Sequence, residues 1–389
     1  MRLRRDGSPT VHSGSRFECR VSILLFIVAN LFGSAQVFAQ SSNTPAAAPG
    51  LASAEISRTD RKQLQDELRT PEQVSRIMRR AEAGSARDQF MIGYAFASGI
   101  GEPQDSAQAL NWYERAANLS EPAAMTELGR AYARGQGVPR DFQTALRWFR
   151  RASADGYAPA RTDLGLMYFQ GLGLARDESD AAMWWQKAAQ QGYPPAESNL
   201  GVAYLNGLGS VRDAKQAVQW FQKAAGVGFA TAEFNLASCY ELGQGLPQDL
   251  ALAAKWYRSA AMQGHAEAQN NLALLYEAGR GVPPDPTEAL RLYMLAAANG
   301  NPKAYVNLAQ LFHSGVGVKR DSAQAYTWLA IAAASGEDVG QALDIEAAEL
   351  NASDLFDAQR KAAAWIDQHH LNVIPRALAS STPGVRSAN

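Results

Sequence analysis

Residues 196–225 of the chain read AESNLGVAYLNGLGSVRDAKQAVQWFQKAA, and the same pattern returns every 36 residues. Glycine occupies seven positions that are each 36 residues apart, and a second glycine follows two residues after each of them. In each repeat an aspartate stands four residues after the second glycine of the pair, at positions 105, 141, 177, 213, 249, 285 and 321. Self-similarity at a fixed period is typical of arrays in which each unit stacks on the next. The sequence therefore predicts one all-α solenoid, where the length of 389 residues alone would suggest two or three globular domains.

The first half of each repeat has the spacing of a helix. In the third repeat Ala160, Leu164 and Tyr168 recur every four residues and share one face. Gly171 and Gly173 then end this helix, because glycine adopts the left-handed conformation that other residues resist. Since each such helix is short, we expect its stability to come from stacking against the neighbouring repeat.

The second half of each repeat predicts another helix, which begins after the aspartate. The carboxylate of Asp177 can accept hydrogen bonds from the free N–H groups of the first turn. A tryptophan follows seven residues later in six of the seven repeats, for example Trp184 and Trp220, and Leu292 replaces it in the sixth. Flanking alanines leave room for a neighbouring helix, so we assign the tryptophan column mainly to the core. Stacking of these rings on bases or sugars is the less favoured alternative.

The remaining parts of the chain are assigned from composition and hydrophobic spacing. We predict a leader at 1–39, a flexible linker at 40–58, seven repeats at 84–336 and a disordered tail at 371–389. An N-terminal capping helix is expected within 59–83 and spans Asp60 to Met78. Two C-terminal capping helices are expected within 337–370, at 339–350 and 354–369, and the second starts at Ser353 or Asp354.

Residues 1–39 resemble a secretory signal. A basic segment precedes the apolar run of residues 21–32, and the small side chains of Val37 and Ala39 are suited to cleavage after Ala39. An uncleaved anchor at 21–39 is the alternative, although polar residues interrupt that stretch. We expect a periplasmic or secreted protein or, with the anchor retained, one tethered to the inner membrane and facing the periplasm. Any membrane tether is expected only through residues 21–39.

The repeat resembles the Sel1-like repeat, a relative of the tetratricopeptide repeat. One unit carries the resemblance in Ala196, Leu200, Gly201, Tyr204, Gly207, Gly209, Asp213, Ala217, Trp220, Ala224 and Ala225. The resemblance implies a right-handed α/α superhelix that acts as a protein-interaction scaffold and is not an enzyme. Many bacterial members are exported, and some resemble adaptors in envelope signalling, exopolysaccharide control or host contact. Asp88, Ser120 and Leu292 depart from the pattern, which makes the first repeat the most degenerate.

Composition and the remaining reactive residues exclude several functions. The net charge of −1, or −4 once the five basic and two acidic residues of the leader are removed, argues against a nucleic-acid partner. The paired glycines lack the further residues of a phosphate-binding loop. Cys239 falls in an apolar column and is expected in the core, while His265 and His313 fall in different columns and are expected to be solvated. We therefore predict no catalytic residue, no cofactor and no metal.

One column of the first helix is polar where packing does not require it. Its members are Glu127, Asp163, Asn199, Asn235, Asn271 and Asn307, which we call the polar ladder. In the related tetratricopeptide arrays this helix lines the concave groove, and an amide can donate to and accept from an extended peptide. The alternative is that each side chain bonds the adjacent helix and only stabilises stacking. A second column, Tyr157, Tyr193, Phe229 and His265, either rims the groove or packs the turn between repeats.

The predicted function is an exported scaffold that binds a protein or peptide partner along the concave face. One alternative is a β-lactam-binding or β-lactam-hydrolysing enzyme, as associated with cysteine-rich secreted Sel1-like proteins. This chain lacks their cysteine pairs and has no Ser-x-x-Lys sequence. The other alternative is an adaptor for cell wall or polysaccharide.

Overall fold

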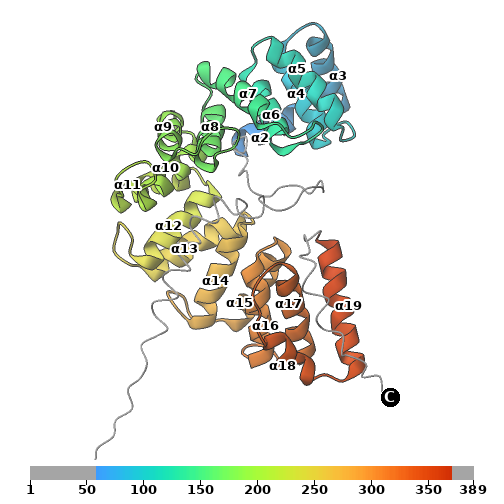
Figure 1. Cartoon of the computed structure of the whole chain (residues 1–389), viewed down its shortest axis with the longest axis vertical. Helices are drawn as coiled ribbons and strands as arrows, with labels where there is room; N and C mark the ends of the chain where they lie inside the picture. Colours follow the sequence, from blue (N-terminus) through green and yellow to red (C-terminus); the bar gives the residue numbers. More distant parts are fainter. Residues whose placement is uncertain (1–57, 370–389) are drawn as a thin grey trace, which may run out of the picture. The chain divides into compact units, whose positions relative to one another are not determined.

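A computed structural model describes residues 58–369 of the protein, and this part of the chain contains eighteen α-helices and no strand (Figure 1). The helices are α2 (Arg58–Glu67), α3 (Pro71–Glu82), α4 (Ala86–Ser98), α5 (Ser106–Asn118), α6 (Pro122–Arg134), α7 (Phe142–Ala154), α8 (Ala158–Gln170), α9 (Glu178–Ala189), α10 (Pro194–Asn206), α11 (Ala214–Gly226), α12 (Ala230–Leu242), α13 (Leu250–Met262), α14 (Ala266–Ala278), α15 (Pro286–Ala298), α16 (Pro302–Ser314), α17 (Ser322–Ala334), α18 (Ala342–Ala348) and α19 (Ala352–Gln368). The even-numbered helices α4 to α16 are the first helices of the seven repeats and are called A helices. The odd-numbered helices α5 to α17 are called B helices.

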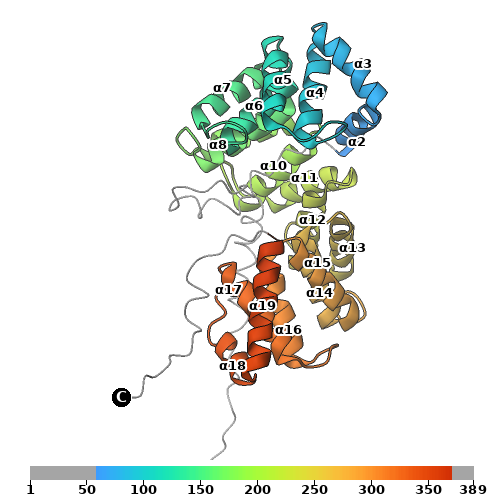
Figure 2. The same cartoon turned by 90° about the vertical axis from the view of Figure 1, so that its right-hand side faces the viewer.

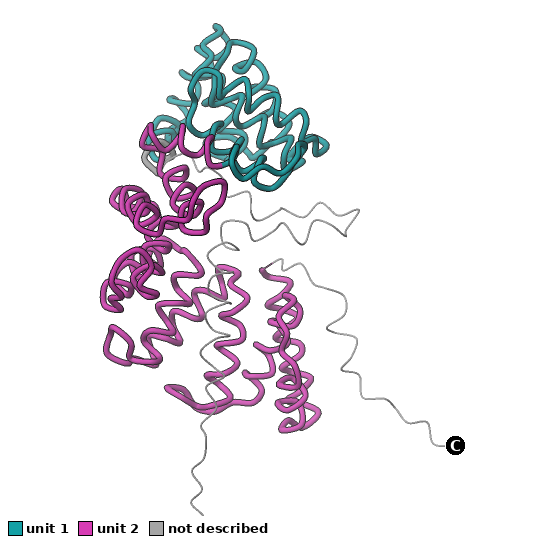
Figure 3. The backbone as a smooth tube through the Cα atoms, turned by 60° about the vertical axis from the view of Figure 1, so that its left-hand side comes forward, with its two compact units in different colours: residues 1–181 teal, residues 182–389 magenta. Residues whose placement is uncertain are grey.

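The chain divides into two compact units inside α9, with residues up to 181 in unit 1 and residues from 182 in unit 2 (Figure 3). Within each unit an A helix packs against the B helix that follows it, and that B helix packs against the next A helix. Direct contacts also join successive A helices, α6 with α8 in unit 1 and α10 with α12 in unit 2. This packing is that of a solenoid, as the repeat period predicts.

The glycine and aspartate columns act at the helix ends. Gly171 ends α8 with a φ of 68° and donates its N–H to carbonyls of the last turn. The Asp177 carboxylate accepts from the N–H groups of Ser179 and Asp180, both at 2.9 Å, and so caps α9. Ser120, which stands where later repeats have glycine, also takes a positive φ of 65°. The left-handed conformation is therefore set by the turn and is tolerated by serine there.

The second glycine of each pair lets one repeat approach the one before it. A Cβ added to Gly173 would lie 2.8 Å from the Cβ of Phe142 in α7, and one added to Gly245 would lie 2.1 Å from the carbonyl oxygen of Ala214 in α11. The loops after α6, α8, α12, α14 and α16 thus rest on the first turn of the preceding B helix. Glycine is required here both for its positive φ and for its missing side chain.

The tryptophan column is only partly core, which corrects the prediction. Trp112 and Trp328 are buried, with 7 and 4% of their surface exposed. Trp184 and Trp220 are only half-buried, and the Nζ atoms of Lys187 and Lys223 lie 4.5 and 3.9 Å from the centres of their rings. The fully buried ring is the next residue along the chain, as in Phe221. That ring packs against Gly201 of the paired A helix, where an added Cβ would lie 2.5 Å from it.

The helical caps differ from the prediction in their bounds. The expected single helix from Asp60 to Met78 is two helices, α2 and α3, because Thr70 forms a capping box with Gln73 and Pro71 begins a new helix. At the other end α18 and α19 pack on α17 (Figure 2). Asn351 caps α19, in place of the expected Ser353 or Asp354.

Residues 58–369 contain no helix with the length and apolar character needed to cross a bilayer. The predicted leader, the linker up to residue 57 and the predicted tail lie outside the described residues.

Candidate partner-binding site on the A helices

The structure places every member of the polar ladder near the middle of an A helix, but their exposure differs along the array. Asp163, Asn199 and Asn235 are buried, with 6, 4 and 2% of their surface exposed. Glu127, Asn271 and Asn307 are partly exposed. Of the four asparagines, Asn271 and Asn307 are therefore the ones with partly accessible side chains.

In unit 1 the two acidic residues of the polar ladder are joined by an arginine that was not predicted from the sequence. Arg130 of α6 donates from Nη1 to Glu127 Oε1 at 2.6 Å and from Nε to Asp163 Oδ2 of α8 at 2.8 Å. Burial raises the pKa of Asp163, and the positive charge of Arg130 opposes that rise. These three side chains form an ion network that links two successive A helices.

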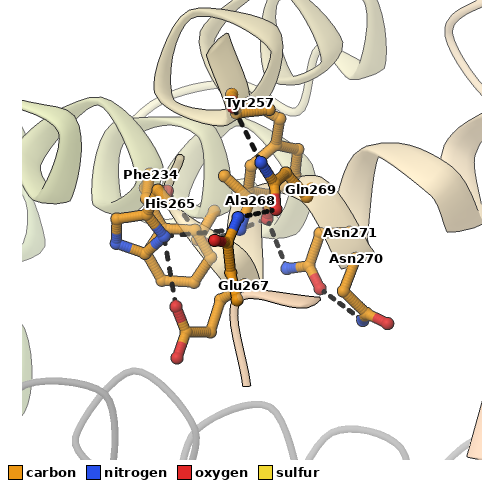
Figure 4. A network of polar contacts seen from close by, with 11 residues as sticks. Phe234, Tyr257, His265, Glu267, Ala268, Gln269, Asn270 and Asn271 are labelled. Atoms are coloured by element: carbon orange, nitrogen blue, oxygen red, sulfur yellow. Dashed lines mark hydrogen bonds and ion pairs between the residues drawn. The ribbon is translucent and has the colours of Figure 1, made fainter. Parts of the chain in front are cut away.

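In unit 2 the amides also make bonds between repeats. Asn235 Nδ2 donates to Ser198 Oγ of α10 at 3.3 Å, and Asn307 Nδ2 donates to Asn270 Oδ1 of α14 at 2.8 Å. Asn271 accepts at Oδ1 from Asn270 Nδ2 at 3.3 Å (Figure 4). The ladder therefore does contribute to stacking, which was one of the two alternatives for it.

The Tyr257 hydroxyl connects this ladder to the core of unit 2. It accepts from Asn271 Nδ2 at 3.2 Å, donates to Glu241 Oε2 at 2.9 Å and lies 3.0 Å from Ser238 Oγ. Figure 4 shows the Asn271 amide turned toward Tyr257. Burial, and then the negative charge of Glu241, raises the pKa of Tyr257, so the hydroxyl keeps its proton. Asn271 is thus held in a fixed orientation.

The exposed face of α14 carries Asn271 together with an apolar side chain. Asn271, Leu274 and Ala278 follow the i, i+3, i+7 spacing that places residues on one side of a helix. Leu274 is 42% exposed. The equivalent face of α16 carries Asn307 and the exposed Gln310. These two A helices offer amides beside an accessible apolar group.

Cys239 and His313 lie where the sequence predicts, one in the core and the other at the surface. Cys239 is fully buried, and burial raises the pKa of its thiol to about 12, so the reactive thiolate is not formed near neutral pH. Among residues 58–369 no group of three His, Cys, Asp or Glu side chains is arranged to hold a metal. His313 is exposed and contacts Glu346 of α18.

Comparison with known families gives seven consecutive matches to the Sel1 repeat, at residues 86–121, 122–157, 158–193, 194–228, 230–265, 266–301 and 302–337. The chain belongs to the Sel1 repeat family. Each match contains one A helix and its B helix. Sel1 repeat proteins are in general protein-interaction scaffolds and not enzymes.

Solved structures of other bacterial proteins are similar to this chain. A Sel1 repeat protein from Oxalobacter formigenes is 33% identical, with a TM-score of 0.58 over 64% of this chain and 99% of that one. A protective antigen of uropathogenic Escherichia coli, c5321, is 24% identical, with a TM-score of 0.42 over 82% of this chain and 92% of that one. Immunity protein Pa5087 of Pseudomonas aeruginosa is 22% identical, with a TM-score of 0.41 over 55% and 81%. No match was found among curated proteins.

Several residues of this Sel1 repeat chain that form hydrogen bonds with the polar ladder were not predicted from the sequence. Arg130, Ser198 and Asn270 each contact a ladder residue of the next repeat, which is 33 or 37 residues away. The sequence did contain a sign of the role of Arg130. It is the one charged residue at a repeat position where Leu166, Val202 and Leu274 stand in other repeats. For Ser198 and Asn270 the signal was weaker, since threonine occupies the same column in earlier repeats.

His265 is a helix cap, which corrects the expectation that it is solvated. Its ring stacks on Phe234 with centres 4.8 Å apart, and its Nδ1 accepts from the Ala268 N–H at 3.4 Å (Figure 4). Nδ1 also lies 3.2 Å from Glu267 Oε2. Burial lowers the pKa of His265, an effect that Glu267 opposes. The column that holds Tyr157, Tyr193 and Phe229 likewise provides the residue just before each A helix.

This lowered pKa predicts an acid sensitivity of unit 2. The unfolded chain takes up a proton on His265 near pH 6.5 while the folded chain does not, so stability present above that pH is lost as the pH falls toward the folded pKa. His265→Asn places at α14 the cap that Asn301 provides for α16. Urea unfolding followed by circular dichroism measures the free energy of unfolding. Between pH 7.5 and 5 this free energy should fall less for His265→Asn than for the unaltered chain. Equal losses would contradict the role of His265 as a cap that is lost on protonation.

Proposed function

We propose that this protein is an exported, non-enzymatic scaffold that binds a protein or peptide partner on the A-helix face of its C-terminal repeats. Export is inferred from the leader-like residues 1–39. The observation that carries the binding surface is the exposure of Leu274 beside Asn271 on α14, with Asn307 and Gln310 on the next A helix. A half-exposed leucine flanked by amides suits a partner chain that combines an apolar side chain with free backbone groups.

The buried members of the ladder have a different part in this proposal. Asn199 and Asn235 are almost fully covered, and Asn235 bonds an adjacent A helix. We assign these residues to stacking, and we assign partner contact to Asn271 and Asn307. The orientation of Asn271 by Tyr257 lowers the entropy that the amide loses when it binds.

The experiment compares two leucines of similar exposure on different helices. Leu274 of α14 is 42% exposed and Leu295 of the B helix α15 is 39% exposed. A photo-crosslinking amino acid in place of Leu274 is expected to form adducts in intact cells with one defined protein, and the same residue in place of Leu295 is not. Leu274→Asp should then reduce recovery of that protein at least tenfold, because a carboxylate replaces the apolar contact.

Thermal unfolding of both aspartate variants provides the control for folding. Similar unfolding temperatures for Leu274→Asp and Leu295→Asp would show that lost recovery reflects the surface. Equal crosslinking from both positions, or unchanged recovery with Leu274→Asp, would contradict binding at this face.

A further inference from the structure

The short helix α18, which follows the last repeat, has little stability of its own. It has seven residues, and Gln341 at its N-terminus makes no side-chain cap. Helices this short are not stable in isolation. The segment before it contains Gly336 and Gly340, both with a positive φ, and a Cβ added to Gly340 would meet no atom within 4 Å. The attachment of α18 therefore depends on its contacts with the last repeat.

The surface that α18 covers belongs to the apolar helix α17. Leu343 and Ala347 of α18 are partly buried against the core cluster that includes Trp328 and Leu329 of α17. Helix α17 carries no lysine, arginine, histidine, aspartate or glutamate. Movement of α18 away from the array would therefore expose apolar surface of α17 to water. In this sense α18 is a cover over the last repeat.

Two polar contacts hold α18 to the last repeat. Nδ1 of His313 in α16 lies 2.5 Å from Glu346 Oε1. Arg320 Nη2 donates to both carboxylate oxygens of Glu349, at 2.6 and 2.8 Å, and the Ser322 hydroxyl also donates to Glu349. The hydrogen bond from Ser322, and then the charges of Arg320 and His313, lower the pKa of Glu349. His313 thus acts on two carboxylates of the cover.

The two contacts differ in burial. Arg320 and Glu349 are both exposed, so their ion pair contributes little to the attachment. Glu346 is only 2% exposed, and within residues 58–369 its Oε2 has no hydrogen-bond partner. The imidazole of His313 is the group that faces this buried carboxylate. A buried charge that loses its partner is strongly destabilising.

The helices around this contact provide no other charge that could replace His313. In α16 the remaining charged residue is Lys303, ten positions or about 15 Å earlier along the helix. In α17 the titratable side chain is the phenol of Tyr326. In α18 the exposed Asp344 lies about 200° around the helix from Glu346. The charge at the buried carboxylate is therefore balanced by the proton of His313.

We propose that α18 is a pH-dependent cover of the last repeat, closed while His313 is protonated and loosened when His313 loses its proton. Histidine changes its charge between pH 5 and 8. A proton on His313 meets both carboxylates only while α18 is docked, so the docked form binds it more tightly and docking weakens as the pH rises. Opening hydrates Glu346 and uncovers α17. The device does not depend on the partner proposed for α14.

Hydrogen exchange of the chain without its leader tests this proposal at pH 6 and pH 8, with protection corrected for the intrinsic exchange rate at each pH. Protection of α18 is expected to fall about fivefold from pH 6 to pH 8, while that of α12 stays constant. His313→Gln, which can donate a hydrogen bond but has no charge, should give the weaker protection at both pH values. His313→Lys, which keeps a positive charge, should retain the stronger protection at pH 8.

Two further variants are matched controls. His265→Asn removes another histidine of unit 2 and should leave the response of α18 to pH unchanged. Arg320→Gln removes the exposed cation and should lower protection of α18 equally at both pH values. Protection of α18 that is independent of pH, or the same pH dependence in His313→Gln, would overturn the inference. An equal fall in α12 would do so too, because unit 2 would then be opening as a whole.

Discussion

Gly245→Ala is expected to lower the free energy of unfolding of unit 2 by about 3–5 kcal/mol. Gly245 has a φ of 77°, and its added Cβ would lie 2.1 Å from the Ala214 carbonyl oxygen and 2.5 Å from the carbonyl carbon. Backbone cannot move aside as a flexible side chain can. The loop after α12 must therefore lift from the first turn of α11, which separates two repeats that stabilise each other. Urea unfolding followed by circular dichroism measures the loss.

Gly228 separates the strain of the backbone from the contact. It also has a positive φ, 79°, but an added Cβ would meet no atom within 4 Å. Gly228→Ala should therefore destabilise by only about 1–2 kcal/mol, the left-handed penalty alone. Hydrogen exchange should further show faster opening of α11 to α13 in Gly245→Ala than in Gly228→Ala. Equal destabilisation by the two alanines would contradict the role assigned to the second glycine.

The parts of the fold that follow from local physics were predicted well. The positive φ of Gly171 and the cap at Asp177 depend on a few adjacent residues, so the column pattern contains the information. The choice between Trp184 and Trp185 as the buried ring was not predictable in this way. Adjacent residues on a helix differ in direction by about 100°, and both suit an apolar face. Where the paired A helix carries glycine, the buried ring is the one that meets it, as Phe149 meets Gly129 and Phe221 meets Gly201.

Partner contact by the polar ladder stays a prediction, and the burial of its members differs along the array. The ladder column from Glu127 to Asn307 could be found because its polarity departs from its surroundings. Its burial could not, since exposure depends on how closely successive A helices approach. The buried Asn235 and the partly exposed Asn271 have similar local sequences, because each is followed directly by a leucine. Their partners come from neighbouring repeats, which a periodic pattern alone does not specify.

Arg130→Leu is expected to destabilise unit 1 by about 3–5 kcal/mol, because it leaves the buried carboxylate of Asp163 without its hydrogen-bonded cation. Asp163 is 6% exposed, and Glu127 adds a second negative charge nearby. Arg134 also faces Asp163 and offsets part of this repulsion. Removing one partner of a buried pair is far more destabilising than removing both. Thermal and urea unfolding of the single variant test this loss.

The chain itself contains the compensating pair. One repeat later, leucine and asparagine occupy the two equivalent positions, at Leu166 and Asn199. Arg130→Leu combined with Asp163→Asn should therefore recover most of the lost stability, with a coupling energy of about 2–3 kcal/mol in the double-mutant cycle. In the single variant the pKa of Asp163 rises further, so the folded form holds a proton that the unfolded form releases above about pH 4. Its instability should then grow as the pH rises through the folded pKa and shrink in acid. Additive effects in the cycle, or a loss that does not change as the pH is raised from about 4, would contradict a buried ion network at this junction between A helices.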